Sequence, residues 1–339
     1  MGKKYKKTLG IAGEAKNHYI PIIQAQHAHQ WPTHSYLFQQ PLLQIPLQPL
    51  GSSSLSRPDF YVCHGDPVDF LIDWKERVRT RIPFICVAND TRPGGDWEIG
   101  SAGTYEERLC RRSSLSATLA TPGPGSQVER NYPIPSEGGI YSEFVVVFRG
   151  PQPYYTPLTQ WHDIPVISME AVKFPRLDRT SLTYTFPMEL NMVKNKIRAA
   201  LRICAYYGHR SVVIGDFGLG RGFRNPPQQL AELWREMFLY DPDVRGRFDH
   251  VAFVFEDVSQ NTTKHILEDL AKKDRYSNQW SNSKGKGKSK ESASSGSQST
   301  GDVASPTDIE IFQHVFSANE IHRITTRPDP RYDISMLTT

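Results

Sequence analysis

The sequence predicts an α/β fold in which a largely parallel or mixed β-sheet lies between helices. Apolar runs of strand length alternate with segments of helical periodicity over most of the chain. Two of these runs end in glycine-rich loops that lead into helices, as the strand–loop–helix units of such folds do. The length of 339 residues also allows a sizeable buried core.

The expected strands are short runs rich in apolar, β-branched and aromatic residues. They cover residues 59–65, 82–90, 142–150, 164–170, 211–218 and 248–257. Ligands bind to folds of this class beyond the carboxyl ends of the strands. The loops that follow 82–90 and 211–218 are therefore the expected location of a site.

Helices are expected where capping residues precede amphipathic segments. Asp66 is expected to cap one helix, with a proline at its first position, and Asn225 to cap another that begins at Pro226. A third should begin near Thr104, and a long amphipathic helix should end at Gly208.

Composition divides the chain into five segments. Residues 1–38 are expected to form an N-terminal helical segment, and the Pro/Gln/Ser-rich residues 39–58 a loop. Residues 59–274 form the main α/β domain. The Ser/Gly/Lys-rich residues 275–306 hold too little apolar surface to offset the entropy of ordering, so they are expected to be disordered. Residues 307–339 regain apolar spacing and are expected to pack back on the domain.

Composition also excludes several classes of protein. The net charge of +4 gives no electrostatic reason to expect direct nucleic-acid binding. The longest apolar runs are too short to cross a bilayer, and no apolar segment of a secretory signal follows the basic N-terminus. The four cysteines lack zinc or disulfide spacing, and the histidines of "QHAHQWPTH" lack partner ligands, so no metal site is expected. A reducing intracellular location, cytoplasmic or nuclear, is the natural interpretation.

Two adjacent carboxylates, Glu106 and Glu107, open the helix that follows the first loop. An ordinary structural role explains them fully. Thr104 as N-cap and Glu107 at the third helical position fit a capping box. Glu107 also stands four residues before Arg111, the favourable order for an ion pair on a helix.

The preceding loop favours a functional role for the two carboxylates. Asn89, at the end of a buried strand, is followed by Gly94 and Gly95 and by further small residues. Adjacent glycines let backbone N–H groups approach an anionic ligand, and a helix N-terminus adds positive potential. The two carboxylates would then lie beside a pocket suited to phosphate. On the residues alone, both interpretations stay open.

The second loop, "GDFGLGRGFRNPP", holds more glycine than a turn requires. Its glycines are spaced as GxGxG instead of the GxGxxG of a dinucleotide site, and it lacks the GKS or GKT motif of a P-loop. What remains is a run of backbone donors able to wrap a diphosphate, with Phe217 and Phe223 available to stack on a sugar or base. The loop glycines are Gly215, Gly218, Gly220 and Gly222.

Together the loops resemble the signatures of the microbial-type poly(ADP-ribose) glycohydrolase domain, a family with a macrodomain-like fold. The first signature, PGGG followed by QEE and an "LCxRSSL"-like helix, is matched by residues 93–96, by "YEE" and by "RLCRRSSL". The second, similar to "GxxGCGxFRNxP", is matched by "GDFGLGRGFRNPP". The resemblance covers about residues 7–257. It implies a three-layer α/β/α macrodomain-like fold with a mixed central sheet.

The resemblance implies an ADP-ribose glycohydrolase that cleaves a ribose glycosidic bond of poly- or mono-ADP-ribosylated macromolecules, with neither metal nor cofactor. Glu107 would be the catalytic acid, Glu106 would hold hydroxyls of the scissile ribose, and Asn89 would contact that ribose. The leaving oxygen of such a bond needs a proton while the ring carbon becomes cationic, which suits a pair of carboxyls. The other expected ligand contacts, from the resemblance or from the loops themselves, are Gly94, Gly95, Phe217, Gly218, Gly220, Gly222 and Phe223.

Three departures from the family pattern leave an alternative open. Tyr105 replaces the glutamine of QEE, Asp96 replaces the third glycine of PGGG, and both loops are one residue longer. Two like charges about 4 Å apart cost on the order of 4 kcal/mol at an effective dielectric constant near ~20. Asp96 is therefore expected to point away from a diphosphate, unless the ligand has changed. The alternative is a binding module that reads ADP-ribose without cleaving it.

Overall fold

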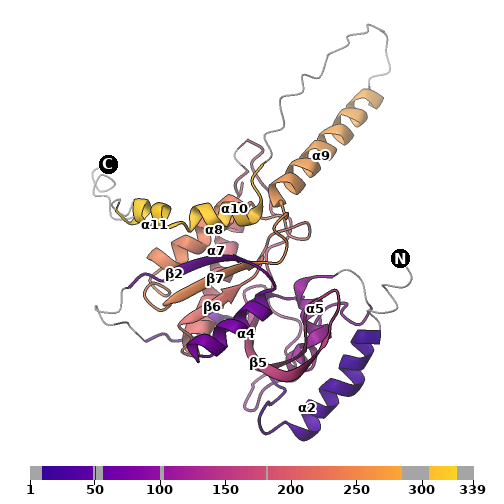
Figure 1. Cartoon of the computed structure of the whole chain (residues 1–339). Coiled ribbons are helices and arrows are strands. Elements are labelled where there is room, and N and C mark those ends of the chain that lie inside the picture. Colours follow the sequence, from indigo (N-terminus) through magenta and orange to yellow (C-terminus); the bar gives the residue numbers. More distant parts are fainter. Residues whose placement is uncertain are drawn as a thin grey trace.

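The structure, a computed structural model, describes residues 10–48, 50, 56–99, 103–180, 182–284 and 305–326, and for 276–284 it describes the backbone alone. Most of the Ser/Gly/Lys-rich segment and the last residues of the chain lie outside these ranges. Within them, a sheet lies between two layers of helices (Figure 1). The predicted three-layer α/β/α fold with a mixed sheet is therefore confirmed.

The middle layer is a seven-stranded sheet, counted over the described residues, in the order β1-β4-β5-β3-β6-β7-β2. The strands are β1 (Tyr36–Phe38), β2 (Asp59–His64), β3 (Phe84–Val87), β4 (Gly139–Arg149), β5 (Pro157–Met169), β6 (Ser211–Ile214) and β7 (His250–Phe255). β4 pairs antiparallel with both β1 and β5, whereas the pairs from β5 through β3, β6 and β7 to β2 are parallel. The carboxyl ends of the parallel strands therefore meet at one end of the sheet.

Helices cover both faces of this sheet (Figure 1). On one face lie α7 (Pro187–Tyr206), α8 (Pro227–Tyr240) and α10 (Asp308–Val315). On the other lie η1 (Ala15–Tyr19), α2 (Ile20–Gln26), α4 (Pro67–Val78), α5 (Tyr105–Arg112) and α6 (Leu115–Ala120). Side chains alternate between the two faces along each strand. Val212 and Ile214 accordingly join the core beneath α7 and α8, and Val213 joins the core beneath α4.

Most of the expected elements are present. Asp66 caps α4 as predicted, because its carboxylate accepts two backbone N–H groups of the first turn. Thr104 is the N-cap of α5, and Gly208 follows α7 with a φ of +75°. The edge strand β1 and the four-residue helix α3 (Pro41–Gln44) were not expected, because segments this short carry no readable periodicity.

The start of α8 requires a correction. Pro226 occupies the N-cap position, and Asn225 is not the cap. The Asn225 amide instead donates to the carbonyls of Val172 and Gly218, each at 2.8 Å. Asn225 therefore fixes the second loop to the chain that follows β5. Local capping preference predicted the wrong role, because one of these acceptors, the Val172 carbonyl, lies 53 residues away in the sequence.

The C-terminal part of the chain contains more helix than its composition predicted. α9 (Thr262–Lys284) reaches into residues 275–306, because extending an existing helix adds a hydrogen bond for each residue ordered. The rest of the segment predicted to be disordered, 285–304, lies outside the described residues. Beyond it, α10 packs on α8 and β2 and is followed by α11 (Ala318–Thr325). No helix in the described ranges combines the length and apolar character that a membrane span requires.

Candidate active site

The two glycine-rich loops lie side by side because the strands that precede them are neighbours. β3 and β6 pair in parallel, with Phe84 opposite Val213, so both chains leave the sheet at the same end. Between the loops is an open pocket of about 510 Å³. The pocket is lined mainly by Gly103, Thr104, Tyr105, Glu107 and Arg108 on the α5 side, and by residues 215–217 and 219–223 and Gln260 on the other.

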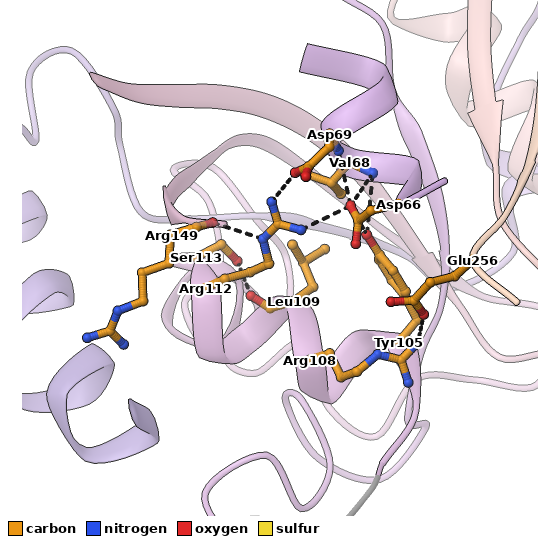
Figure 2. Close-up of polar contacts among 10 residues, drawn as sticks. All are labelled: Asp66, Val68, Asp69, Tyr105, Arg108, Leu109, Arg112, Ser113, Arg149 and Glu256. Carbon is orange, nitrogen blue, oxygen red and sulfur yellow. Dashed lines mark hydrogen bonds and ion pairs between the residues drawn. The ribbon is translucent and has the colours of Figure 1, made fainter. Parts of the chain in front are cut away.

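Polar side chains hold the first turn of α5 in place (Figure 2). The Tyr105 hydroxyl donates to Asp66 at the start of α4, 2.9 Å away. Arg108 forms an ion pair with Glu256, which directly follows β7. Because Tyr105 and Arg108 flank the two carboxylates in the sequence, these contacts set the position of the carboxylates.

Arg112 anchors the other end of α5 (Figure 2). Its buried guanidinium contacts Asp66 at 3.0 Å, Asp69, and the carbonyl of Arg149 at 3.0 Å. Removing one partner of a buried ion pair costs roughly 3–5 kcal/mol, because the remaining charge stays buried. The helix that carries Glu106 and Glu107 is therefore held at both ends.

Glu106 is the deeper of the two carboxyls. It is 1% exposed, its Oε2 accepts the Asn89 N–H at 2.7 Å, and the Gly94 N–H also bonds to the carboxyl group. Burial raises the pKa of this carboxyl to about 8, although the two backbone donors act in the opposite direction. Glu106 is therefore protonated at neutral pH. It ties the first loop to α5 and is not among the described residues that line the pocket.

Glu106 should make the protein less stable as pH rises. Between the ordinary glutamate pKa and about 8, the folded chain keeps a proton that the unfolded chain has released. The contribution of Glu106 to the free energy of unfolding is therefore fully present below the unfolded pKa. It falls by about 1.4 kcal/mol per pH unit between about pH 5 and pH 8. Glu106→Gln keeps an acceptor for Asn89 but cannot ionise, so we expect this slope to vanish. Urea unfolding of both proteins at several pH values measures it, and identical slopes would contradict the assignment.

Glu107 faces the pocket and does not form the predicted capping box. The Thr104 hydroxyl accepts the Glu107 N–H, but the Glu107 carboxylate does not return to Thr104. Its Oε1 accepts the Asp96 N–H at 3.2 Å instead. Oε2 has no hydrogen-bond partner among the described residues, and Arg111 Nη2 lies 3.9 Å away. The first loop thus supplies the donor that turns this carboxylate away from its own helix.

Gly103 leaves the space that the Glu107 carboxyl group occupies. A β-carbon built on Gly103 would lie 1.2 Å from Glu107 Oε2 and 2.3 Å from Glu107 Cδ. Any other residue at this position would therefore displace the carboxyl group.

The two substituted side chains direct their polar groups away from the pocket. Asp96 forms an exposed ion pair with Arg92, which is the first of the two outcomes expected for it. Tyr105 packs edge-on against Phe84, with ring centroids 5.3 Å apart, and its hydroxyl is bound to Asp66. Neither substitution brings a negative charge to the space between the loops.

Asn89, Gly94 and Gly95 shape the first loop around the two carboxylates and do not line the pocket itself, as far as the described residues define it. The two glycines have φ values of +71° and +56°, and a β-carbon on Gly94 would lie 2.6 Å from Cys110 Sγ. The Gly94 N–H bonds to Glu106, and the Gly95 N–H to a carbonyl of the same loop. In this conformation these donors serve the loop and are not free for an anion, contrary to the expectation.

The second loop is anchored from the C-terminal part of the chain. Gly220 donates its N–H to the Thr262 hydroxyl at 2.7 Å. Asp308, buried at the start of α10, accepts the N–H and the hydroxyl of Thr262 at 2.9 and 2.6 Å, and the Gln260 amide at 2.9 Å. The Gly220 N–H is therefore occupied and unavailable to a ligand, although the loop was expected to offer it.

Other donors of the second loop remain free. The N–H groups of Gly218, Arg221 and Gly222 have no acceptor among the described residues, and the last two residues line the pocket. Phe223 lines the pocket as well and is half-buried. Phe217 is 4% exposed and packs into the core beneath α8, so its ring is not free to stack on a ligand as expected.

Gly103, Thr262 and Asp308 were not expected from the sequence. For Gly103 a signal existed, since a glycine directly before an N-cap leaves room for the side chain at the third helical position. Asp308 lies within a capping box formed by Thr307 and Glu310, which accounts for an acidic residue there without any further role. No local sequence signal identifies Asp308 as an anchor of the second loop.

Comparisons with known proteins agree with this geometry. Residues 49–150 match the family described as microbial-type PARG (poly(ADP-ribose) glycohydrolase), catalytic domain. The resemblance predicted from the two loops is therefore confirmed. The matched range contains the first loop with Glu106 and Glu107 and ends before the second loop. No curated protein matches the chain significantly.

Solved poly(ADP-ribose) glycohydrolases share the fold. The structure from Thermomonospora curvata bound to the inhibitor ADP-HPD is 19% identical, with a TM-score of 0.56, over 77% of this chain and 97% of that chain. A point mutant from Deinococcus radiodurans in complex with ADP-ribose is 23% identical, with a TM-score of 0.51, over 68% of this chain and 91% of that chain. At these identities the likeness establishes the macrodomain-like fold and nothing finer.

Proposed function

We propose that the chain is an ADP-ribose glycohydrolase, which cleaves a ribose glycosidic bond of poly- or mono-ADP-ribosylated substrates by carboxylate acid catalysis. The observation that carries this proposal is the position of Glu107 on the wall of the pocket between the two glycine-rich loops. A volume of about 510 Å³ lies within the range of small-molecule sites. The family match over the first loop and the two ligand-bound structures of similar fold support it.

In the proposed reaction Glu107 donates a proton to the leaving oxygen while the ribose ring carbon becomes cationic. Oε2 of Glu107 is buried and forms no hydrogen bond in the described part of the chain, with Arg111 Nη2 3.9 Å away, and we assign the proton transfer to this atom. Glu106 lies buried behind it, holds the first loop against α5, and so positions Glu107. Adjacent helical residues point about 100° apart, which is why the two carboxyls take different roles.

The second loop would hold the diphosphate. The free N–H groups of Arg221 and Gly222 line the pocket, and the exposed Arg221 side chain adds a positive charge. Arg108 supplies a second cation, although it is already bound to Glu256 and to the Gly103 carbonyl. The Phe223 ring is placed to stack on a sugar or base.

Replacing Asp308 should weaken the binding of ADP-ribose through the second loop. Asp308→Ala removes the acceptor of Thr262 and frees Gly220 to move, so we expect about tenfold weaker binding and a loss of roughly 1–3 kcal/mol in unfolding free energy. Thr262→Val removes only the hydroxyl that holds Gly220 and should reproduce the loss of affinity. Calorimetry gives the dissociation constants.

Glu310→Ala is the matched control for this pair. It removes one half of the capping box of the same helix, the acceptor of the Thr307 N–H, without touching the loop. An equal loss of ADP-ribose affinity in Glu310→Ala would show that general loosening of α10, and not the anchoring of Gly220, is responsible.

The alternative function, binding without cleavage, was motivated by Tyr105 and Asp96. Both direct their polar groups away from the pocket, which removes that motive. Incubating the protein with poly(ADP-ribose) and with a mono-ADP-ribosylated protein, followed by chromatography of free ADP-ribose, tests the proposal. We expect release from at least one substrate. If ADP-ribose raises the melting temperature but neither substrate is cleaved, the chain is a binding module.

A further inference from the structure

A second hollow, the aromatic groove, lies beside the second loop and has a volume of about 340 Å³. The chain after β5, the start of α7 and one side of α9 enclose it, and its lining includes Phe174, Arg176, Phe186, Arg224, Asp269 and Lys273. The groove adjoins the candidate pocket through the loop itself. Phe223 lines the pocket, the next residue lines the groove, and the Phe174 N–H donates to the Phe223 carbonyl at 2.7 Å.

Two phenylalanine rings are exposed in this groove, each beneath an arginine. Phe174 is 59% exposed and Phe186 is 41% exposed. The Arg224 guanidinium lies 5.5 Å from the centre of the Phe174 ring, and that of Arg176 lies 5.5 Å from the centre of the Phe186 ring. Contiguous exposed apolar surface rimmed by polar residues can mark a ligand-binding groove. The pairing with arginine suits flat, electron-rich groups that carry negative charge nearby.

The groove is positively charged. Arg176, Arg179, Arg224 and Lys273 line it, and Asp269 is the one acidic residue among its described lining residues. Arg224 is paired with Asp269, and Arg179 is paired with Asp274 at 2.6 Å. Within the described residues, Arg176 and Lys273 form no ion pair with an acid. Two cations thus remain for an anionic ligand.

The backbone of the groove is held in a conformation that side chains disfavour. Phe174 and Arg224, which line the groove, have φ values of +51° and +62°. The left-handed region costs an ordinary residue roughly 1–2 kcal/mol, and such strain gathers at ligand sites when surrounding contacts enforce it. The bond from Phe174 to the Phe223 carbonyl is one such contact, and it couples the groove to the loop of the pocket.

We propose that the aromatic groove binds the neighbouring nucleotide unit of a poly(ADP-ribose) chain whose terminal unit occupies the pocket. This inference rests on the proposed function and narrows its substrate to the polymer. A neighbouring unit supplies an adenine for the rings and a diphosphate for Arg176 and Lys273, because bases stack on aromatic rings irrespective of sequence and guanidinium groups pair with phosphate. A mono-ADP-ribosylated protein offers no nucleotide beyond the pocket.

The test compares the binding of two probes, ADP-ribose and purified poly(ADP-ribose) of defined length, to the full chain. Binding is measured in a Glu107→Gln background, so that the polymer stays intact. Phe186→Ala and Arg176→Ala should each weaken polymer binding about tenfold, as expected for a lost stacked base or phosphate contact. Both should leave the dissociation constant of ADP-ribose unchanged. Lys264→Ala, which removes an exposed charge from the same helix outside the groove lining, should change neither.

Unchanged polymer affinity in both variants would overturn the proposal, and so would a loss of ADP-ribose affinity equal to the loss of polymer affinity. A third contradicting result concerns oligoadenylate RNA: it binds the wild-type groove as tightly as the polymer does, and its binding is lost in the same variants. This third result would make the groove a nucleic-acid site.

The groove proposal and the glycohydrolase proposal can fail separately. If the wild-type chain releases no ADP-ribose but polymer binding depends on Phe186 and Arg176, only the glycohydrolase proposal falls. If release occurs and the variants bind polymer normally, only the groove falls. If neither probe binds, both proposals fall.

Discussion

Glu107→Gln is expected to lower the kcat for ADP-ribose release by about a hundredfold or more, which is the usual contribution of a positioned general acid. Glutamine has the shape of the carboxyl group and can still accept the Asp96 N–H, but it cannot donate an acidic proton. The affinity for ADP-ribose should therefore change little. Release of ADP-ribose from the polymer, measured under single-turnover conditions, gives the rate of the chemical step.

Glu98→Gln is the matched control for this variant. Glu98 lies in the same loop, but its side chain is exposed and paired with Lys16 at 2.8 Å. Turnover should be unchanged. If Glu107→Gln retains the wild-type rate while Glu106→Gln loses it, the buried carboxyl is the proton donor and the roles assigned to the two residues are reversed.

Gly103→Ala is expected to lower kcat by roughly a hundredfold while the protein stays folded, because displacement of a catalytic group by about 1 Å can have an effect of that size. The added methyl group would coincide with the Glu107 carboxyl group. That group is the end of a flexible side chain, so the side chain moves and the fold remains. Circular dichroism and the melting temperature should be close to those of the wild type.

Gly150→Ala is the control for the glycine substitution. Gly150 lies between β4 and β5, away from the loops, and its nearest neighbour to an added β-carbon is the Thr156 carbonyl at 3.7 Å, an ordinary contact. Wild-type turnover in Gly103→Ala would mean that the carboxyl group acts from a different position, and the geometry of Glu107 described above would not be the reactive one.

The layers and the location of the site follow from sequence patterns that act locally. Alternation of strands and helices places β3 and β6 in one sheet. Their glycine-rich ends then mark where ligands bind, whatever the details of packing. Thr104 and Asp66 cap their helices as expected, because capping depends on residues within one turn.

The predictions from the sequence were wrong where a contact outside the local segment overrides a local preference. Asn225 was expected to cap α8, but its amide donates to the carbonyls of Val172, in the chain after β5, and Gly218, in its own loop. Glu107 fits a capping box in sequence, yet the Asp96 N–H draws its carboxylate to the first loop. Phe217 lies in the second loop after β6, where its ring could face either way, and it packs into the core beneath α8. Asp308 acts on a loop from which almost ninety residues separate it, including a segment that is not described.

A crystal structure of the wild-type chain with ADP-ribose tests the central claim most directly, namely that one pocket between the two loops brings the ribose to Glu107. We predict that the diphosphate lies against the N–H groups of Arg221 and Gly222, with a Glu107 oxygen about 3 Å from the anomeric hydroxyl of the terminal ribose. ADP-ribose bound elsewhere would contradict the account. So would a nucleotide in the pocket with the Glu107 carboxyl group turned away from the ribose.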